Sequence, residues 1–223
     1  KVLPAPEHER SLLLPGLEDA AAVAIMCRAL GSAAEVSGAA HLPAAVASLL
    51  ALGSGAATLL RLEGTTLSVA ERIALLRREL GGAGVEVEEP ESKTVWRALR
   101  DIAPFQGTEE AIWRLSLPPA AGAAVMQAIA ASGVAGARHF YDWGGGLIWL
   151  ALPAEGDAAA ARIRAALKPT GGHATLMRAP LSLRAAVDVF QPQEPALAAL
   201  ARRVKESFDP AGRLNPGRMY QGI

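Results

Sequence analysis

Two kinds of hydrophobic spacing alternate along this chain. Apolar residues recur at every second position or form short runs where we predict β-strands, and at every third or fourth position where we predict helices. Strands are predicted at 10–15, 34–41, 56–63, 85–89, 110–117, 138–143, 147–152 and 173–178. Helices are predicted at 17–30, 69–80, 92–102, 122–132, 157–167 and 195–207. The chain is therefore expected to be an α+β protein.

The predicted elements follow one order twice. Strand, helix, strand, strand, helix, strand occurs in the first part and recurs about 100 residues later, with the helix at 92–102 as the connection. This βαββαβ order is the ferredoxin-like unit, an antiparallel sheet with helices on one face. We favour one continuous sheet over two separate small domains, because joining the units hides strand edges that would otherwise be open.

Strand alternation indicates which side chains lie on the sheet face that the helices leave open. By this counting the open face carries Arg61, Arg114 and Trp149, together with His139 and Tyr141. A guanidinium binds a carboxylate with two parallel hydrogen bonds, and aromatic rings exclude water from the same site. Arg61, Arg114 and Tyr141 are therefore candidate residues for binding a small carboxylic acid.

His173 is the fourth candidate for this site. It follows Gly171 and Gly172, which allow the backbone to approach a ligand closely. The four histidines are scattered, and the chain has one cysteine, so neither residue type forms a metal-binding motif. We predict no metal site.

Charge and hydropathy exclude two classes of partner. Lys plus Arg and Asp plus Glu number 22 each, so the net charge is zero and indicates neither nucleic-acid binding nor attraction to an anionic membrane. The apolar runs are shorter than the roughly 20 residues that a membrane span needs. We expect no transmembrane segment.

The end of the chain carries its most specific motif. Residues 208–220 read FDPAGRLNPGRMY and contain two successive proline turns after the predicted helix at 195–207. With KVLP at 1–4, WRLSLPP at 113–119, YDWGGG at 141–146 and GGHATL at 171–176, this string resembles FAD-linked oxidases of the vanillyl-alcohol oxidase type. Together these stretches resemble the FAD-binding subunits of bacterial glycolate oxidases, which are members of that family.

The resemblance implies a division of the chain. Residues 1–9 would be the linker from an N-terminal FAD domain that this sequence lacks, because it shows no glycine-rich phosphate loop after a strand. Residues 10–190 would form the cap, the substrate-side domain over the flavin, with repeats at 10–90 and 91–180. Residues 191–223 would return to the FAD domain, where Asn215 lies near the flavin and Arg218 pairs with a negative group.

The resemblance also implies a function. It predicts the cap region of an FAD-dependent subunit oxidising glycolate or a similar small 2-hydroxy acid, in a cytoplasmic complex that lies at the inner membrane. The partners would be a larger flavoprotein subunit and an iron–sulfur subunit. FAD would belong to the full-length protein, and we expect this chain alone to be inactive and not to hold FAD.

Two other functions remain open. Related oxidases with a metal-assisted hydroxy acid site have clustered histidines that this chain lacks, so the subunit could instead serve assembly or electron transfer without catalysis. A ferredoxin-like domain that binds a small effector is the third reading. It would leave the FDPAGRLNPGRMY motif as a coincidence.

Overall fold

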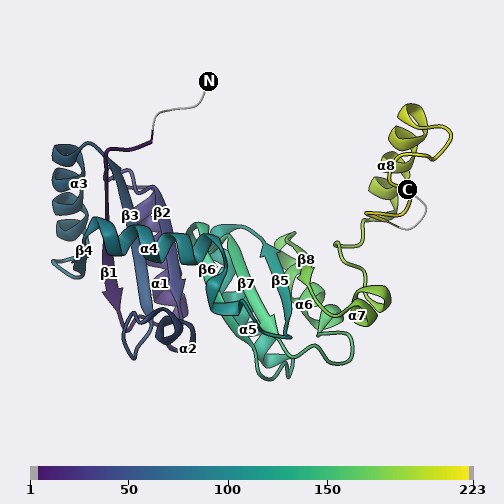
Figure 1. Cartoon of the computed structure of the whole chain (residues 1–223), viewed down its shortest axis with the longest axis horizontal. Coiled ribbons are helices and arrows are strands. Elements are labelled where there is room, and N and C mark those ends of the chain that lie inside the picture. The colour runs from purple at the N-terminus through teal and green to yellow at the C-terminus, as the bar shows by residue number, and fades with distance from the viewer. Residues whose placement is uncertain (1–4, 221–223) are drawn as a thin grey trace.

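The computed structural model describes residues 5–220, and eight strands in that part of the chain form one sheet (Figure 1). Neighbouring strands run antiparallel throughout. The strands are β1 (His8–Pro15), β2 (Gly38–Leu42), β3 (Ala57–Gly64), β4 (Val85–Val87), β5 (Ala111–Ser116), β6 (Arg138–Asp142), β7 (Leu147–Leu152) and β8 (His173–Arg178). Each predicted strand is confirmed, with ends displaced by a few residues.

The strand order shows how the two repeats are joined. It runs β4-β1-β3-β2-β6-β7-β5-β8, so each repeat contributes four neighbouring strands in the same internal order. The repeats meet at β2 and β6, where His41 pairs with Tyr141. The prediction of a single sheet is therefore confirmed.

Helices α1 (Asp19–Leu30), α3 (Thr66–Glu79), α5 (Gly122–Ala131) and α6 (Ala160–Leu167) pack on one sheet face. This is the predicted arrangement of the repeat helices. The connecting helix α4 (Glu89–Arg100) crosses the opposite face, next to the short α2 (Ala44–Ala47). The amphipathic stripe of α4 causes this, because its residues Val95 and Leu99 belong to one buried cluster with Leu59 and Phe140 of the sheet.

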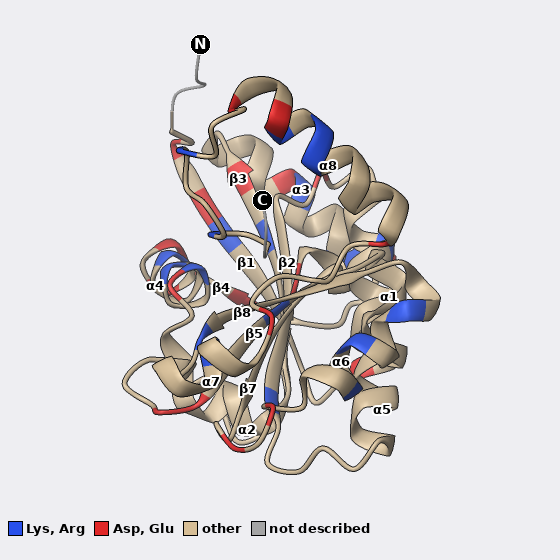
Figure 2. Cartoon of the chain, turned by 90° about the vertical axis from the view of Figure 1, so that its right-hand side faces the viewer, with Lys and Arg blue, Asp and Glu red and all other residues tan. Residues whose placement is uncertain are grey.

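The end of the chain leaves the sheet beyond β8. The unpredicted helix α7 (Leu181–Ala186) precedes α8 (Pro195–Phe208), which lies at the opposite end of the molecule from β1 (Figure 1). No residue of α8 is buried. Acidic and basic residues are interspersed on α4 and α8 (Figure 2), in agreement with the zero net charge. Within residues 5–220 no helix is long and apolar enough to span a membrane.

Candidate functional site

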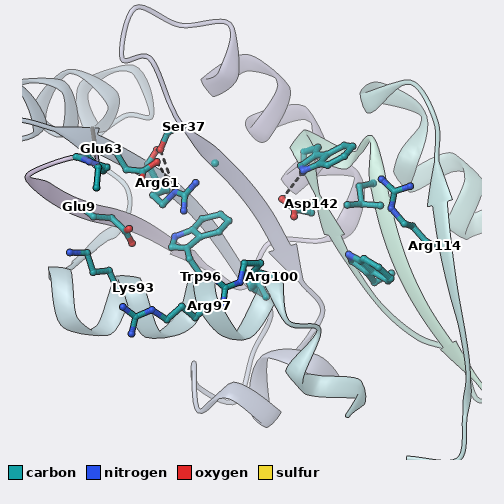
Figure 3. Close-up of a pocket in the computed structure, with 17 residues that line it drawn as sticks. Glu9, Ser37, Arg61, Glu63, Lys93, Trp96, Arg97, Arg100, Arg114 and Asp142 are labelled. Atoms are coloured by element: carbon teal, nitrogen blue, oxygen red, sulfur yellow. Dashed lines mark hydrogen bonds and ion pairs between the residues drawn. The ribbon is translucent and has the colours of Figure 1, made fainter. Parts of the chain in front are cut away.

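A cavity of about 770 Å³ lies on the sheet face opposite the four repeat helices (Figure 3). Both repeats line it. Arg61 of β3 and Trp96 of α4 come from the first part of the chain, and Arg114, Trp143 and Trp149 come from the second. The cavity therefore depends on the joining of the two repeats into one sheet.

The Arg61 side chain is held on one side of this cavity. Its guanidinium carbon lies 4.8 Å from the centroid of the Trp96 ring, and its Nε lies 3.2 Å from Glu63 Oε2 and 3.3 Å from Ser37 Oγ. A Cβ at Gly38 would lie 3.2 Å from both Arg61 Nε and the Trp96 ring. The glycine therefore leaves room for the arginine to stack on the indole.

A buried network of side-chain hydrogen bonds holds the Trp96 ring in place. Its Nε1 donates to Ser11 Oγ at 2.8 Å, and Ser11 Oγ lies 2.8 Å from Ser92 Oγ. Ser92 in turn donates to Glu9 Oε1 at 2.6 Å. These groups join α4 to β1 with their polar atoms satisfied, so the indole is held in one orientation.

Arg114 lies on the other side of the cavity, above Trp143. Its guanidinium carbon is 5.4 Å from the Trp143 ring centroid. Among residues 5–220, Arg114 forms no ion pair with a carboxylate. A cation that is stacked but has no acidic partner is available to bind an anionic ligand.

The turn after β6 places Trp143. This residue has a φ of 51°, which is unusual for a bulky side chain, and its N–H donates to Asp142 Oδ1 at 2.7 Å. The Trp143 side chain is 57% exposed. Residues held in sparsely populated backbone conformations are concentrated at functional sites.

The glycines that follow are required for packing. Gly145 has a φ of 95°, and a Cβ there would lie 2.6 Å from the carbonyl oxygen of Pro119. A Cβ at Gly122, where α5 begins, would lie 2.5 Å from the Gly145 carbonyl oxygen. The backbone of this glycine run is thus covered by protein and does not form a phosphate-binding loop.

The remaining charges of the cavity come mainly from α4. Lys93 pairs with Glu89, and Arg100 lies 2.8 Å from Asp101. Burial raises the pKa of the Asp142 carboxyl, while its backbone hydrogen bond and the charge of Arg61 act in the opposite direction. The cavity lining therefore combines five cationic side chains, three indole rings and the carboxyls of Glu9, Glu63 and Asp142. Cations outnumber carboxyls, and this set suits a small anionic substrate.

Two of the four predicted substrate residues, Arg61 and Arg114, line the cavity. The predicted position of Tyr141 on the open face is wrong. Its side chain is fully buried on the helix side, where the hydroxyl donates to Asp19 Oδ2 at 2.6 Å. His139 also lies on that side, 3.0 Å from the same oxygen. Phe140 lies on the α4 side of the sheet. Strand alternation counted from Phe140 places its neighbours His139 and Tyr141 on the other side, where the four repeat helices pack.

His173 lies outside the lining of the cavity. It is exposed at the start of β8 and pairs with Ser116 of β5. The glycine before it has a packing role, because a Cβ at Gly172 would lie 2.8 Å from the Ser116 carbonyl oxygen. A role of His173 in substrate binding stays a prediction.

Asn215 and Arg218 lie in the turn beyond α8, where they line a hollow of about 420 Å³ with Lys205. Asp209 organises this turn. Its carboxylate accepts hydrogen bonds from the N–H groups of residues 213 and 214 at 2.9 and 2.7 Å, and from Lys205 Nζ at 2.6 Å. The hydrogen bond from Lys205, with those from the backbone, lowers the pKa of Asp209 to about 2.

The sequence-based prediction missed Trp96, Trp143 and Asp142. The amphipathic pattern of 92–102 carried a signal for Trp96, because it places this residue on the apolar stripe. No pattern indicated the positive φ of Trp143. Within residues 5–220 there is no cluster of three or more His, Cys, Asp or Glu suited to a metal ion.

Comparison with known proteins finds one family model and one curated relative that are similar in sequence. The family model of FAD linked oxidases, C-terminal domain, matches residues 190–219. Glycolate oxidase subunit GlcE of Escherichia coli (strain K12) is 32% identical over 162 residues, which are 72% of this chain and 38% of that protein. The chain thus spans less than half the length of this curated relative.

The fold matches two solved structures over 99% of this chain. These are p-cresol methylhydroxylase with substrate bound, with a TM-score of 0.65 and 15% identity, and 4-ethylphenol oxidase from Gulosibacter chungangensis, with 0.61 and 14%. The matches cover 54% and 55% of those chains. The chain therefore shares the fold of these oxidases, and residues 190–219 are similar in sequence to the C-terminal domain of FAD-linked oxidases.

Proposed function

We propose that this chain is the substrate-side region of an FAD-dependent subunit that oxidises glycolate or a similar small 2-hydroxy acid. The similarity to a glycolate oxidase subunit supports the choice of substrate. The observation that carries the proposal is Arg114, a stacked guanidinium in the cavity that forms no ion pair with the described residues. This is the group that a substrate carboxylate requires.

The cavity suits the ring end of the flavin better than its phosphate end. Its volume of about 770 Å³ exceeds the needs of a two-carbon acid and leaves room for part of a planar ring beside Trp143 and Trp149. The glycine run at 144–146 is closed by Pro119 and cannot hold a pyrophosphate. We therefore propose that FAD is held mainly by a domain outside this chain, with Asn215 and Arg218 directed toward that domain.

Within this site each residue has a distinct role. Arg114 binds the substrate carboxylate, and Arg61, which pairs with Glu63, holds the Trp96 ring on the other side of the cavity. The indoles of Trp96, Trp143 and Trp149 exclude water, which strengthens these electrostatic contacts. The bound flavin would accept the two electrons released when the 2-hydroxy acid becomes a 2-oxo acid.

Substitution of Arg114 tests the proposal in the protein that carries this chain together with its FAD domain. We expect Arg114→Ala to lower kcat/KM for glycolate by about 10- to 100-fold, because a hydrogen bond to a charged group is typically worth about 1.5–3 kcal/mol. Anaerobic bleaching of the flavin by glycolate measures the reaction. The spectral change on adding oxalate measures binding of a carboxylate without turnover.

The matched control is Arg78→Ala, which removes an exposed arginine of α3 that lies outside the cavity lining. It should leave both measurements unchanged. If Arg114→Ala binds oxalate and reduces flavin as the unsubstituted protein does, the assignment of Arg114 is wrong.

The second candidate is a non-catalytic subunit for assembly or electron transfer between a larger flavoprotein subunit and an iron–sulfur subunit. The exposed apolar stripe of α8, formed by Leu197, Leu200, Val204 and Phe208, favours it as an interface. The same reduction experiment separates the two. If neither glycolate nor lactate bleaches the isolated flavoprotein, the catalytic proposal fails and this candidate is favoured.

A further inference from the structure

Three carboxyls line the cavity between the two repeats, and Asp142 differs from the other two. Glu9 accepts a hydrogen bond from a serine hydroxyl at 2.6 Å, and Glu63 Oε2 lies 3.2 Å from Arg61 Nε. Asp142 has no side-chain partner among residues 5–220. It is therefore the carboxyl of this cavity that is available to a substrate.

The two oxygens of Asp142 have different surroundings. Oδ1 accepts a hydrogen bond from the backbone N–H of Trp143 at 2.7 Å, which orients the carboxyl. Oδ2 accepts no hydrogen bond from residues 5–220 but keeps contact with solvent. Because Asp142 is half-buried and lines the cavity, a ligand there can donate to Oδ2.

The register of the sheet sets the separation of Asp142 from Arg114. β7 lies between their strands, and Trp149 of β7 pairs with Arg114 of β5 and with Phe140 of β6. Asp142 is two residues beyond Phe140, so its Cα lies about 10 Å across the sheet and about 7 Å along it from that of Arg114. The Arg114 side chain occupies part of this separation, because its guanidinium carbon lies 5.4 Å from the ring centroid of Trp143, the residue after Asp142.

Asp142 occupies a central place among the cavity residues. In the view of Figure 3 it lies between Arg61 and Arg114, so a ligand whose carboxylate is bound by Arg114 extends toward Asp142 when it extends into the cavity. Burial raises the pKa of Asp142, while its backbone hydrogen bond and the charge of Arg61 act in the opposite direction. A carboxylate with a raised pKa retains a transferred proton more readily than an ordinary one.

We propose that Asp142 is the general base that accepts the hydroxyl proton of the 2-hydroxy acid. The inference rests on the proposed function, since it requires the substrate carboxylate at Arg114 and the flavin as the oxidant. The substrate O–H bond breaks, and its proton goes to Asp142 Oδ2. The C2–H bond breaks, its hydrogen and electron pair go to the flavin, and the C2–O bond becomes a double bond. The products are the 2-oxo acid, protonated Asp142 and reduced flavin.

Asp142→Asn tests the assignment in the protein that carries this chain together with its FAD domain. The asparagine oxygen can still accept from the Trp143 N–H, but the amide cannot take up the proton. We expect anaerobic bleaching of the flavin by glycolate to slow by about 100-fold or more. Oxalate has no hydroxyl proton, and it should bind at least as tightly as before, because a negative charge near this dianion is removed. Arg114→Ala, in contrast, should weaken oxalate binding.

The matched control is Glu79→Gln, since Glu79 is an exposed carboxyl of α3 that does not line the cavity. It should change neither measurement. If bleaching of Asp142→Asn slows by less than expected, the assignment is wrong while the proposed function stands.

Two other results would also decide the matter. Loss of oxalate binding in Asp142→Asn would overturn the assignment, because Asp142 would then maintain the shape of the site. If neither glycolate nor lactate bleaches the unsubstituted protein, the proposed function itself fails, and the base falls with it. Circular dichroism confirms that each variant is folded.

Discussion

Asp19 joins the two repeats through a single carboxylate. Its oxygens lie within hydrogen-bond distance of His41 from the first repeat and of His139 and Tyr141 from the second. Burial raises the pKa of this carboxyl, but the hydrogen bonds from His139, His41 and Tyr141 outweigh burial and hold the pKa well below its usual range. Asp19 is therefore ionised in the folded protein, and its charge stabilises the junction.

Asp19→Asn should lower the free energy of unfolding at pH 7 by about 1–3 kcal/mol, after allowance for the partial exposure of the side chain. Because the folded-state pKa is lowered, this stabilisation is present above the unfolded pKa of about 3.9 and is lost as the pH falls below it. Urea unfolding at pH 7 and pH 3 measures the difference. Glu18→Gln, a change at the exposed neighbour, is the control and should leave the free energy of unfolding nearly unchanged. If Asp19→Asn lowers this free energy equally at both pH values, the account is wrong.

At the scale of elements, the turn between β6 and β7 shows how packing determines a local structure. Its three glycines have no hydrophobic pattern, and their positions between two strands indicate only a connection. In the fold they allow the turn to contact the start of α5 at Gly122 and the segment before it at Pro119. The same contacts hold Trp143 over Arg114, so this turn links the helix side of the sheet to the cavity.

Gly145→Ala should destabilise the protein by about 2–4 kcal/mol, because the new Cβ combines a strained φ with a backbone clash. Gly133→Ala separates these causes, since Gly133 also has a positive φ of 83° but has nothing within 4 Å of the added Cβ. Thermal unfolding of the two variants measures the difference. Equal losses of stability would mean that the close packing of the turn contributes nothing.

At the scale of the whole molecule, the two repeats share one core. Met26 of α1 and Leu60 of β3 belong to the same buried cluster as Trp113 of β5 and Met126 of α5. A second cluster under α4 joins Leu59 of the first repeat to Phe140 and Ala151 of the second. The repeats are thus units of sequence and topology, while the cores extend across both.

We therefore expect the chain to unfold in one cooperative transition. Urea denaturation followed by tryptophan fluorescence and by far-ultraviolet circular dichroism should give coincident curves. Met126→Ala, a change in the second repeat, should shift both curves together by about 2–5 kcal/mol. A second transition that Met126→Ala leaves in place would show that the repeats are separate folding units.

The amino-acid sequence alone determined the element order, the duplicated unit and the sheet face of Arg61 and Arg114. These features follow from local periodicity, because the alternation of a strand records which of its sides is buried. The motif in residues 208–220 also indicated the similarity to FAD-linked oxidases that the family model finds at residues 190–219. Short segments such as α2 and α7 were missed because four to six residues carry too little periodicity.

The tertiary structure decided which distant residues share a site. It paired Arg61 with Trp96, Arg114 with Trp143 and Tyr141 with Asp19. Periodicity cannot supply these neighbours, because they depend on which strands join and on the face that a connecting helix crosses. The side of the sheet for Tyr141 was decided by packing against α1, since both faces of β6 carry aromatic residues and its pattern alone is ambiguous.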